Sequence, residues 1–313
     1  MLFGKYQFFC RLQNEAILPY FKGSTFRGVF GRALKKVVCA LKKEECKDCL
    51  LRDRCLYVHV FETSLADRES NNSRLNTPPH PFVIEPPLTT MTHFQEGDSF
   101  DFCLVLFGEV NQNLPYFIYA FEQMGKIGIG KRIKGEMGQF TLEKVQSGDQ
   151  LIYSNSDQKL NMAESFGTIS LQDPGDYPKG SFRTSITIIT PLRLKFQNRL
   201  KAELPFHVLV RAMLRRVSSL YDCYEDGEPP LDYRGLVKKA EEVQIVDSDL
   251  AWFDWKRYSS RQDKSMLMGG VIGSITYEGD IGEYMPLVDL CTQFHLGKQT
   301  TFGLGMISAE IIE

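Results

Sequence analysis

The sequence predicts an α+β protein made of two ferredoxin-like domains in tandem, and two observations lead to this fold class. A chain of 313 residues exceeds what one hydrophobic core usually fills and suits two domains of ordinary size. Both halves of the chain also predict one order of elements: strand, helix, strand, strand, helix, glycine-rich loop and strand. That order is typical of the split βαβ unit, and a repeat of this size indicates a domain duplication.

The first half opens with an extended, aromatic-rich segment from Leu2 to Leu12, which predicts a strand. Apolar residues then recur every three or four positions from Phe26 to Leu41, which predicts an amphipathic helix that Ser24 or Thr25 would cap. A cysteine-rich segment and a loop from Asp67 to Pro81 follow. The remaining expected elements are strands at 81–85 and 99–110, a helix at 115–124, a glycine-rich loop and a strand at 139–145.

The second half repeats this order after a predicted hairpin insertion and linker at 148–180. We therefore expect an N-terminal domain at 1–147, with its cysteine-rich segment at 39–55, and a C-terminal domain at 181–313. The elements expected in the second domain are a strand at 183–196, a helix at 204–224, strands at 243–246 and 268–277, a helix at 282–295, a glycine-rich loop at 297–305 and a strand at 306–312.

The composition is that of a soluble globular protein, with 43% hydrophobic and 24% charged residues. No stretch approaches the roughly 18–20 uninterrupted apolar residues of a membrane span, and the opening residues lack the order of a signal peptide. We expect a cytoplasmic protein with no membrane partner.

Basic residues are concentrated in two segments, although the formal net charge is −2. The segment from Lys22 to Lys43 holds seven basic residues and no acid, and the segment from Arg183 to Arg216 holds eight with the single acid Glu203. Such segments are often solvated faces, but two without counter-charges favour a polyanionic partner.

Glycines cluster after the second predicted helix of each half, at equivalent places in the repeat. Glycine lets the backbone approach a phosphate closely and turn its N–H groups toward it, although glycines after a helix are also common caps. Neither cluster is a GxxxxGK[ST] motif. The two clusters and their basic neighbours are Gly125, Gly128 and Gly130 with Lys126, Lys131, Arg132 and Lys134, and Gly297, Gly303 and Gly305 with Lys298.

Five segments carry a resemblance to a known family: LPYFKGSTFRGVFGRALKKVVC, the C-x2-C-x5-C run followed by FE, LPFHVLVRAMLRRVSSL, WFDWKRYSSRQ and FHLGKQTTFGLG. The sequence resembles the RAMP superfamily of CRISPR-associated proteins, specifically the endoribonucleases that process precursor crRNA. The resemblance implies tandem RAMP or RRM-like ferredoxin-like folds, glycine-rich loops that face RNA, and cleavage of CRISPR repeat RNA into guide RNAs with no cofactor for catalysis.

Two other classes of function stay open. One is a non-catalytic RAMP subunit that binds guide RNA in a CRISPR effector complex. The other is a metal or redox protein built around the cysteines. Other effector subunits and a second copy of the chain, as a homodimer, are further candidate partners.

The chemistry that the resemblance implies needs no metal. A 2′-hydroxyl attacks the adjacent phosphorus when a base removes its proton, and an acid protonates the departing 5′-oxygen. Cations and oriented N–H groups stabilise the added charge on the phosphorane. The products are a 2′,3′-cyclic phosphate and a 5′-hydroxyl.

His295 is the first candidate for the general acid, because it ends a predicted helix and a helix C-terminus favours the imidazolium. A structural cap is the alternative. Lys298 is expected to stabilise the phosphorane, while His59 and Tyr258 are further catalytic candidates. Many relatives place a catalytic histidine on the first helix, but residues 23–43 contain none.

Two groups of cations are further candidates for RNA binding. Arg211 and Arg215 follow His207 at four-residue intervals, so the three form one polar stripe of a helix. Arg257 and Arg261 alternate with aromatic residues, a mixture that suits single-stranded bases. A solvated face and a half-buried strand end are the alternatives.

Cys39, Cys46, Cys49 and Cys55 lie within 17 positions of one another. Four thiolates with one C-x2-C spacing predict a structural Zn²⁺ site or an iron–sulfur cluster. Buried free thiols are the alternative.

Overall fold

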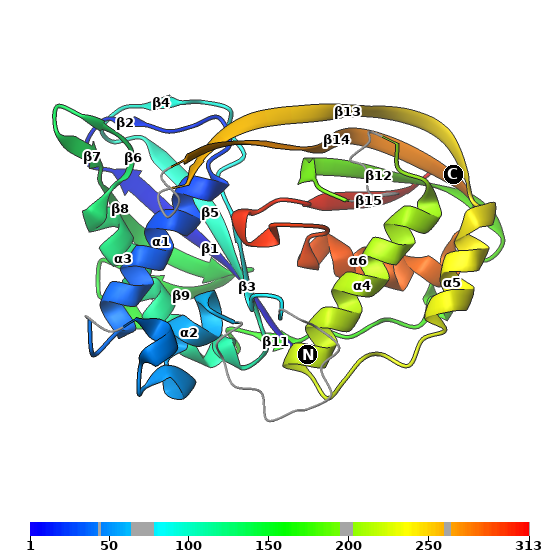
Figure 1. Cartoon of the computed structure of the whole chain (residues 1–313), viewed down its shortest axis with the longest axis horizontal. Coiled ribbons are helices and arrows are strands. Elements are labelled where there is room, and N and C mark those ends of the chain that lie inside the picture. Colours follow the sequence, from blue (N-terminus) through cyan, green and yellow to red (C-terminus); the bar gives the residue numbers. More distant parts are fainter. Residues whose placement is uncertain (43–44, 64–77, 195–202, 260–263, 313) are drawn as a thin grey trace. The chain divides into compact units, whose positions relative to one another are not determined.

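The computed structural model describes residues 1–42, 45–63, 78–194, 203–259 and 264–312. They form two compact units, residues 1–168 with 222–225 and residues 169–221 with 226–313 (Figure 1). The predicted loop at 67–81 lies outside the described residues up to position 77. Among the described helices, none is long and apolar enough to cross a membrane.

The first unit has a ferredoxin-like core. Its elements in chain order are β1 (Leu2–Leu12), α1 (Gly23–Val38), β3 (Phe82–Glu85), β5 (Ser99–Phe107), α3 (Leu114–Ile127) and β8 (Phe140–Ser147). The strands lie in the order β8-β1-β5-β3, and each neighbouring pair is antiparallel. Because each helix connects two strands that are not neighbours, this is the predicted split βαβ arrangement.

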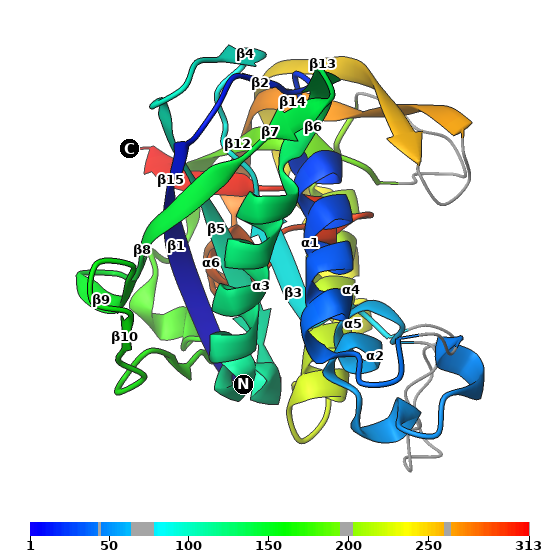
Figure 2. The same ribbon diagram turned by 90° about the vertical axis from the view of Figure 1, so that its left-hand side faces the viewer.

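Alternation along β1 explains which face of this sheet is covered. Tyr6, Phe8 and Cys10 are buried, while the residues between them are partly exposed, as the two-residue period of a strand requires. Helices α1 and α3 lie side by side along the sheet (Figure 2). Phe30 of α1 stacks on Phe121 of α3 with ring centroids 4.4 Å apart, so aromatic rings fill the space between helices and sheet.

Residues beyond β8 extend the same sheet. Strand β9 (Gln150–Ser154) pairs with β8, β10 (Lys159–Leu160) pairs with β9, and β11 (Gly167–Thr168) pairs with β1. Much of the segment predicted as an insertion and linker therefore belongs to the sheet of the first unit.

A smaller sheet and a helical segment complete the first unit. The small sheet has the order β4-β2-β6-β7. Its strands are β4 (His93–Phe94), β2 (Ala16–Ile17), β6 (Ile129–Ile133) and β7 (Glu136–Gly138). Single-turn 3₁₀ helices at Cys46–Asp48 and Arg52–Arg54 precede α2 (Leu56–Phe61) in the cysteine-rich segment.

The second unit repeats the same topology. Its elements in chain order are β12 (Ser181–Leu192), α4 (Phe206–Tyr224), α5 (Tyr233–Lys239), β13 (Gln244–Ser259), β14 (Lys264–Asp280), α6 (Met285–Phe294) and β15 (Ile307–Ile312). The sheet order β13-β14-β12-β15 corresponds strand for strand to β3-β5-β1-β8. This correspondence confirms the predicted duplication and fold class.

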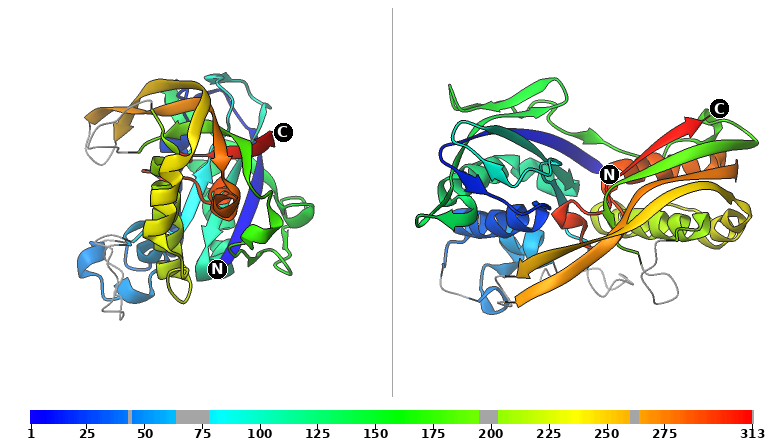
Figure 3. Two further views of the ribbon diagram at one scale, coloured as in Figure 1. Left: turned by 90° about the vertical axis from the view of Figure 1, so that its right-hand side faces the viewer. Right: turned by 90° about the horizontal axis from the view of Figure 1, so that it is seen from above.

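Strands β13 and β14 are much longer than predicted. They pair continuously toward their connection, from Gln244 opposite Glu278 to Ser259 opposite Lys264, with one irregularity near Ile245. The two strands form the yellow and orange ribbon of Figure 3. Polar and charged residues make up much of β13, so a search for apolar runs finds only part of it.

Candidate nucleic-acid interface

The loop between α6 and β15 is tied to the end of β12. Lys298 N donates to Arg193 O (3.2 Å) and Gly305 N donates to Pro191 O (3.2 Å). Thr190 Oγ1 donates to Gly303 O at 2.7 Å. These bonds give the predicted glycine-rich loop a fixed shape.

Five residues of this loop have positive φ angles: His295 (58°), Gly297 (81°), Gln299 (65°), Gly303 (78°) and Gly305 (74°). A Cβ atom on Gly305 would lie 1.8 Å from Leu296 O, so only glycine fits there. His295 and Gln299 adopt this backbone conformation without being glycine, which costs about 1–3 kcal/mol each and is typical of functional loops.

Two of the glycines do not offer free N–H groups to a ligand, contrary to the expectation for this loop. Gly303 and Gly305 are buried, and their N–H groups donate to Thr300 O (2.7 Å) and Pro191 O (3.2 Å). Gly297 is half-buried, and a Cβ there would lie 2.7 Å from Arg193 O. The glycines thus allow the loop to close on itself and on β12.

His295 is located where the sequence predicts it, at the C-terminal end of α6, but its side chain is 0% exposed. Its Nδ1 atom lies 3.1 Å from Leu304 O. A general acid must come within hydrogen-bond reach of the leaving oxygen, and in this structure His295 has no exposed surface. The catalytic role expected of His295 stays a prediction, and its contact with Leu304 O is one that holds the loop.

Two cations belong to the same loop region. Lys298 is exposed, and Arg193, at the end of β12, is half-buried. Arg193 Nη1 lies 3.4 Å from Gln299 Oε1 and 3.2 Å from Met268 Sδ. Within the described residues, Arg193 Nε is buried without a hydrogen-bond partner, and no carboxylate pairs with either cation. The loop therefore presents uncompensated positive charge.

Arg211 and Arg215 are exposed on α4, as the predicted stripe requires, and His207 is partly exposed. Arg216 differs from them, because its guanidinium donates twice to Phe294 O, at 2.8 and 3.1 Å. Arg216 thus holds the end of α6, whereas Arg211 and Arg215 remain available for a ligand.

The first glycine cluster forms a β-hairpin instead of an open loop. Gly128 (φ 83°) and Gly130 (φ 85°) lead into β6, and a Cβ on Gly130 would lie 2.3 Å from Ile17 O. Gly125 lies in α3, where a Cβ would be 2.1 Å from Phe140 O. The basic residues around the hairpin are all exposed: Lys126, Lys131, Arg132 and Lys134. They form a basic edge of the first unit.

The structure describes the remaining catalytic and RNA-binding candidates only in part. His59 is exposed on α2, and its Nε2 lies 2.8 Å from Asp53 O. Arg257 and Tyr258 belong to β13, where the side chains of residues 256–265 are not described, and Arg261 lies outside the described residues. Their expected roles stay predictions.

The structure does not support the predicted metal site. Among the described residues, no three His, Cys, Asp or Glu side chains come close enough to hold a metal ion. Cys39, Cys49 and Cys55 line one cavity of about 470 Å³, but they do not form such a group. Burial raises the pKa of Cys46, and the charge of Lys35 opposes this shift.

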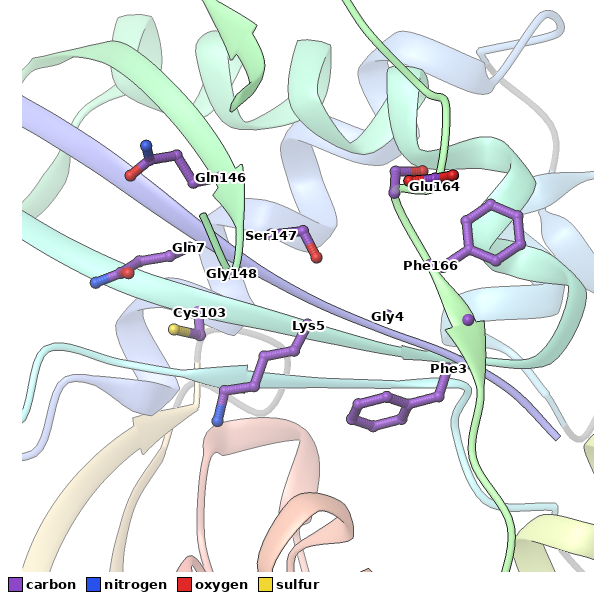
Figure 4. Close-up of a pocket in the computed structure, with 12 residues that line it drawn as sticks. Phe3, Gly4, Lys5, Gln7, Cys103, Gln146, Ser147, Gly148, Glu164 and Phe166 are labelled. Carbon is purple, nitrogen blue, oxygen red and sulfur yellow. The ribbon is translucent and has the colours of Figure 1, made fainter. Parts of the chain in front are cut away.

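A pocket of about 620 Å³ on the sheet of the first unit was missed by sequence reasoning (Figure 4). Phe3, Lys5 and Gln7 line it from alternate positions of β1, and Cys103 lines it from β5. Lys5 Nζ pairs with Glu85 Oε1 at 3.0 Å, and burial raises the pKa of Cys103 to about 12. The polar alternation within an aromatic-rich strand is the signal that could have indicated it.

Both units match models of known protein families. Residues 1–165 match the N-terminal domain model AF_1859_N, and residues 186–307 match the model of the CRISPR-associated endoribonuclease Cas6. An uncharacterized protein of Archaeoglobus fulgidus is 26% identical over 292 residues, which cover 92% of this chain and 91% of that protein.

Solved structures of Cas6 proteins are similar in fold. Thermus thermophilus Cas6 (TTHB231) has a TM-score of 0.55 at 12% identity, covering 99% of this chain and 98% of that chain. The Cas6 (TTHB231) product complex has a TM-score of 0.57 at 14% identity, covering 99% and 100%. A chain of the partial Cas6-RT-Cas1–Cas2 complex has a TM-score of 0.58 at 12% identity, but only 46% of it is covered, against 99% of this chain.

The two duplicated ferredoxin-like units, each with a basic, glycine-rich segment, have the fold of the solved Cas6 structures. The chain belongs to the family of the AF_1859_N domain, and its second half matches the Cas6 endoribonuclease family. The resemblance stated from the sequence is thereby confirmed.

Proposed function

We propose that this protein binds CRISPR repeat RNA and cleaves it without a metal ion to give guide RNAs. The observation that carries the proposal is the fixed loop between α6 and β15, which presents Lys298 and Arg193 without a paired carboxylate among the described residues. This loop lies inside the segment that matches the Cas6 model.

The cations of this loop suit the charge that develops in RNA cleavage. In the proposed reaction the 2′-oxygen bonds to phosphorus, the bond from phosphorus to the 5′-oxygen breaks, and one proton is removed while another is supplied. Cations beside the phosphate stabilise the charge that develops on the phosphorane. Lys298 is such a cation, and its ammonium can also give a proton to the departing oxygen.

A second function is favoured by the burial of His295. The imidazole of His295 is covered, and residues 23–43, where the family resemblance implies a catalytic histidine, contain none. A subunit that binds guide RNA without cutting it would need the cations but no proton-transfer group.

One experiment separates the two functions. The purified protein is incubated in EDTA with repeat RNA from its host and with the same RNA carrying a 2′-deoxynucleotide 5′ of the scissile phosphate. Cleavage of the first RNA and binding without cleavage of the second would support the proposal. Cleavage of both at one rate would rule out attack by the 2′-hydroxyl, and tight binding without any cleavage would establish the guide-binding function.

A further inference from the structure

The second unit contains a cavity of about 460 Å³ between α4 and α5 that no sequence motif indicated. Helix α5 is held firmly at this place. The Asp232 side chain caps it by accepting from Gly235 N (2.9 Å), and Tyr284 of the core donates to Leu236 O (3.0 Å). The α5 wall of the cavity is therefore held in place without a ligand.

Four basic side chains line the cavity, two from each helix. Arg211 and Arg215 lie one turn apart on α4, and Arg234 and Lys238 lie one turn apart on α5. No described carboxylate forms an ion pair with any of them. By contrast, Lys239 on the same short helix pairs with Glu283 at 3.1 Å. The unpaired cations thus converge on the cavity and favour an anion there.

The rest of the lining suits an aromatic ring. Leu214 is buried, and Val237 and Tyr233 are half-buried, so they form an apolar floor. The Tyr233 hydroxyl donates to Pro229 O at 2.9 Å, which anchors the end of its ring. A tyrosine ring anchored in this way beside aliphatic side chains is a surface on which a base stacks.

Two acids, Glu228 and Glu241, also line the cavity and leave an excess of two positive charges. Carboxylates accept hydrogen bonds from exocyclic amino groups of bases and repel phosphate. This arrangement favours a ligand that has a phosphate at one end and an amino-bearing base at the other. The volume lies within the range of small-molecule sites.

We propose that the cavity between α4 and α5 binds a nucleoside phosphate. The phosphate lies on the four cations and the base lies on Tyr233. The ligand is either a free nucleotide from solution or an unpaired nucleotide of a bound RNA chain. Only the RNA ligand rests on the proposed function.

The direct test is titration of the full chain with the four ribonucleoside 5′-monophosphates by calorimetry. We expect saturable binding that is weakest for uridine monophosphate, whose base has no amino group. The double variant Arg234→Ala/Lys238→Ala should weaken binding at least about tenfold, since charge-assisted bonds to phosphate are lost. Lys239→Ala, which changes the neighbouring cation outside the cavity, should leave binding unchanged.

Two substitutions of Tyr233 test whether the base stacks on its ring. Tyr233→Phe keeps the ring and should bind nearly as well as the wild type, whereas Tyr233→Leu removes the stacking surface and should weaken binding about tenfold. Circular dichroism of each variant shows whether it is folded. Equal affinity of folded Phe and Leu variants would overturn the placement of the base.

Repeat RNA distinguishes the two sources of the nucleotide. If the double variant on α5 also lowers the affinity for RNA, and monophosphate competes with RNA, the cavity holds a nucleotide of the RNA chain. If RNA affinity is unchanged while monophosphate binding is lost, the ligand is a free nucleotide. Absence of saturable binding by every monophosphate, together with unchanged RNA affinity of the variant, would overturn the proposal. Failure of the chain to cleave RNA would contradict only the proposed function.

Discussion

At the scale of single residues, His295 and Lys298 are three positions apart and have opposite environments, one buried and one exposed. Replacement of the imidazole by His295→Ala leaves a cavity and an unpaired Leu304 carbonyl. We expect it to lower the free energy of unfolding by about 1–3 kcal/mol, measured by urea denaturation. Lys298→Ala should leave that free energy unchanged and slow single-turnover cleavage by roughly 10²–10⁴-fold.

Exposed Lys179 offers a control for the second substitution, because Lys179→Ala removes an ammonium far along the sequence from the loop. It should change neither stability nor rate. Slow cleavage by a fully stable His295→Ala variant would instead show that the imidazole becomes accessible and acts on the RNA.

Lys22 is a second residue whose environment determines its chemistry. It is 0% exposed, and its Nζ donates to Tyr20 O (3.2 Å) and Thr89 O (2.5 Å). Burial lowers the pKa of Lys22 from 10.5 to about 8. Between these two values the unfolded chain binds more protons than the folded chain, so the free energy of unfolding rises with pH in this window.

The variant Lys22→Met removes this titration and keeps a flexible apolar side chain. We expect the wild type to gain about 1–3 kcal/mol relative to Lys22→Met between pH 8 and 10.5, because a shift of one pKa unit corresponds to 1.36 kcal/mol. Urea unfolding of both proteins at several pH values measures the difference between their free energies of unfolding. Other groups that titrate at alkaline pH are the same in both proteins, so their effects cancel in this difference. A difference that stays constant from pH 7 to 10.5 would show that the two carbonyl bonds keep the ammonium charged.

These residues show where sequence reasoning reached its limit at this scale. The helical period and the following glycines placed His295 at the end of a helix correctly. Burial could not be inferred, because the imidazole contacts Leu304 O in a loop that folds back through five positive φ angles. Local patterns indicate elements, whereas burial depends on contacts between residues distant in the chain.

At the scale of elements, the glycine-rich loop depends on two separate properties of glycine. Gly305 has φ +74°, and its missing Cβ leaves space for Leu296 O. Gly148, in the turn between β8 and β9, has φ +54°, but a Cβ there would meet nothing within 4 Å. The two positions therefore separate the cost of a clash from the cost of the backbone conformation.

We expect Gly305→Ala to lower the free energy of unfolding by more than 3 kcal/mol, because the left-handed conformation and the clash add together. Gly148→Ala should lower it by about 1–2 kcal/mol, the cost of the conformation alone. Equal losses for the two variants in urea denaturation would contradict the tight closure of the loop on Leu296.

The sequence predicted the helices that have strong apolar periodicity and missed a short helix that lacks it. Helices α3, α4 and α6 lie within a few residues of their expected bounds. The seven-residue helix α5 was not predicted, since YRGLVKK is too short to show a period. This omission hid the cavity between α4 and α5, because two of its four cations lie on the helix that was missed.

At the scale of the whole molecule, the duplication gives each unit its own basic region in a chain of net charge −2. The exposed cations of the first unit surround the β6–β7 hairpin, and those of the second lie on the loop after α6 and on α4 and α5. Attraction of RNA must then come from these local groups, because the total charge is slightly repulsive. Equivalent positions after the second helix of each repeat made the hairpin and the loop after α6 predictable from the sequence, whereas the cations of α5 lie on a helix that was not predicted.

Salt dependence tests whether RNA uses both basic regions. For single-stranded nucleic acid, log K falls with log salt concentration by about 0.7 per phosphate contact. We expect Lys131→Ala/Lys134→Ala in the first unit and Arg211→Ala/Arg215→Ala in the second each to reduce the slope by about 0.7–1.4, measured by fluorescence anisotropy with repeat RNA between roughly 50 and 200 mM salt. The control Lys159→Ala/Lys179→Ala removes exposed lysines outside both regions and should leave the slope unchanged.

A slope reduced by only one of the two test variants would confine the RNA to that unit. An equal reduction by the control would mean that RNA is attracted by the overall distribution of charge, with neither region acting as a specific interface.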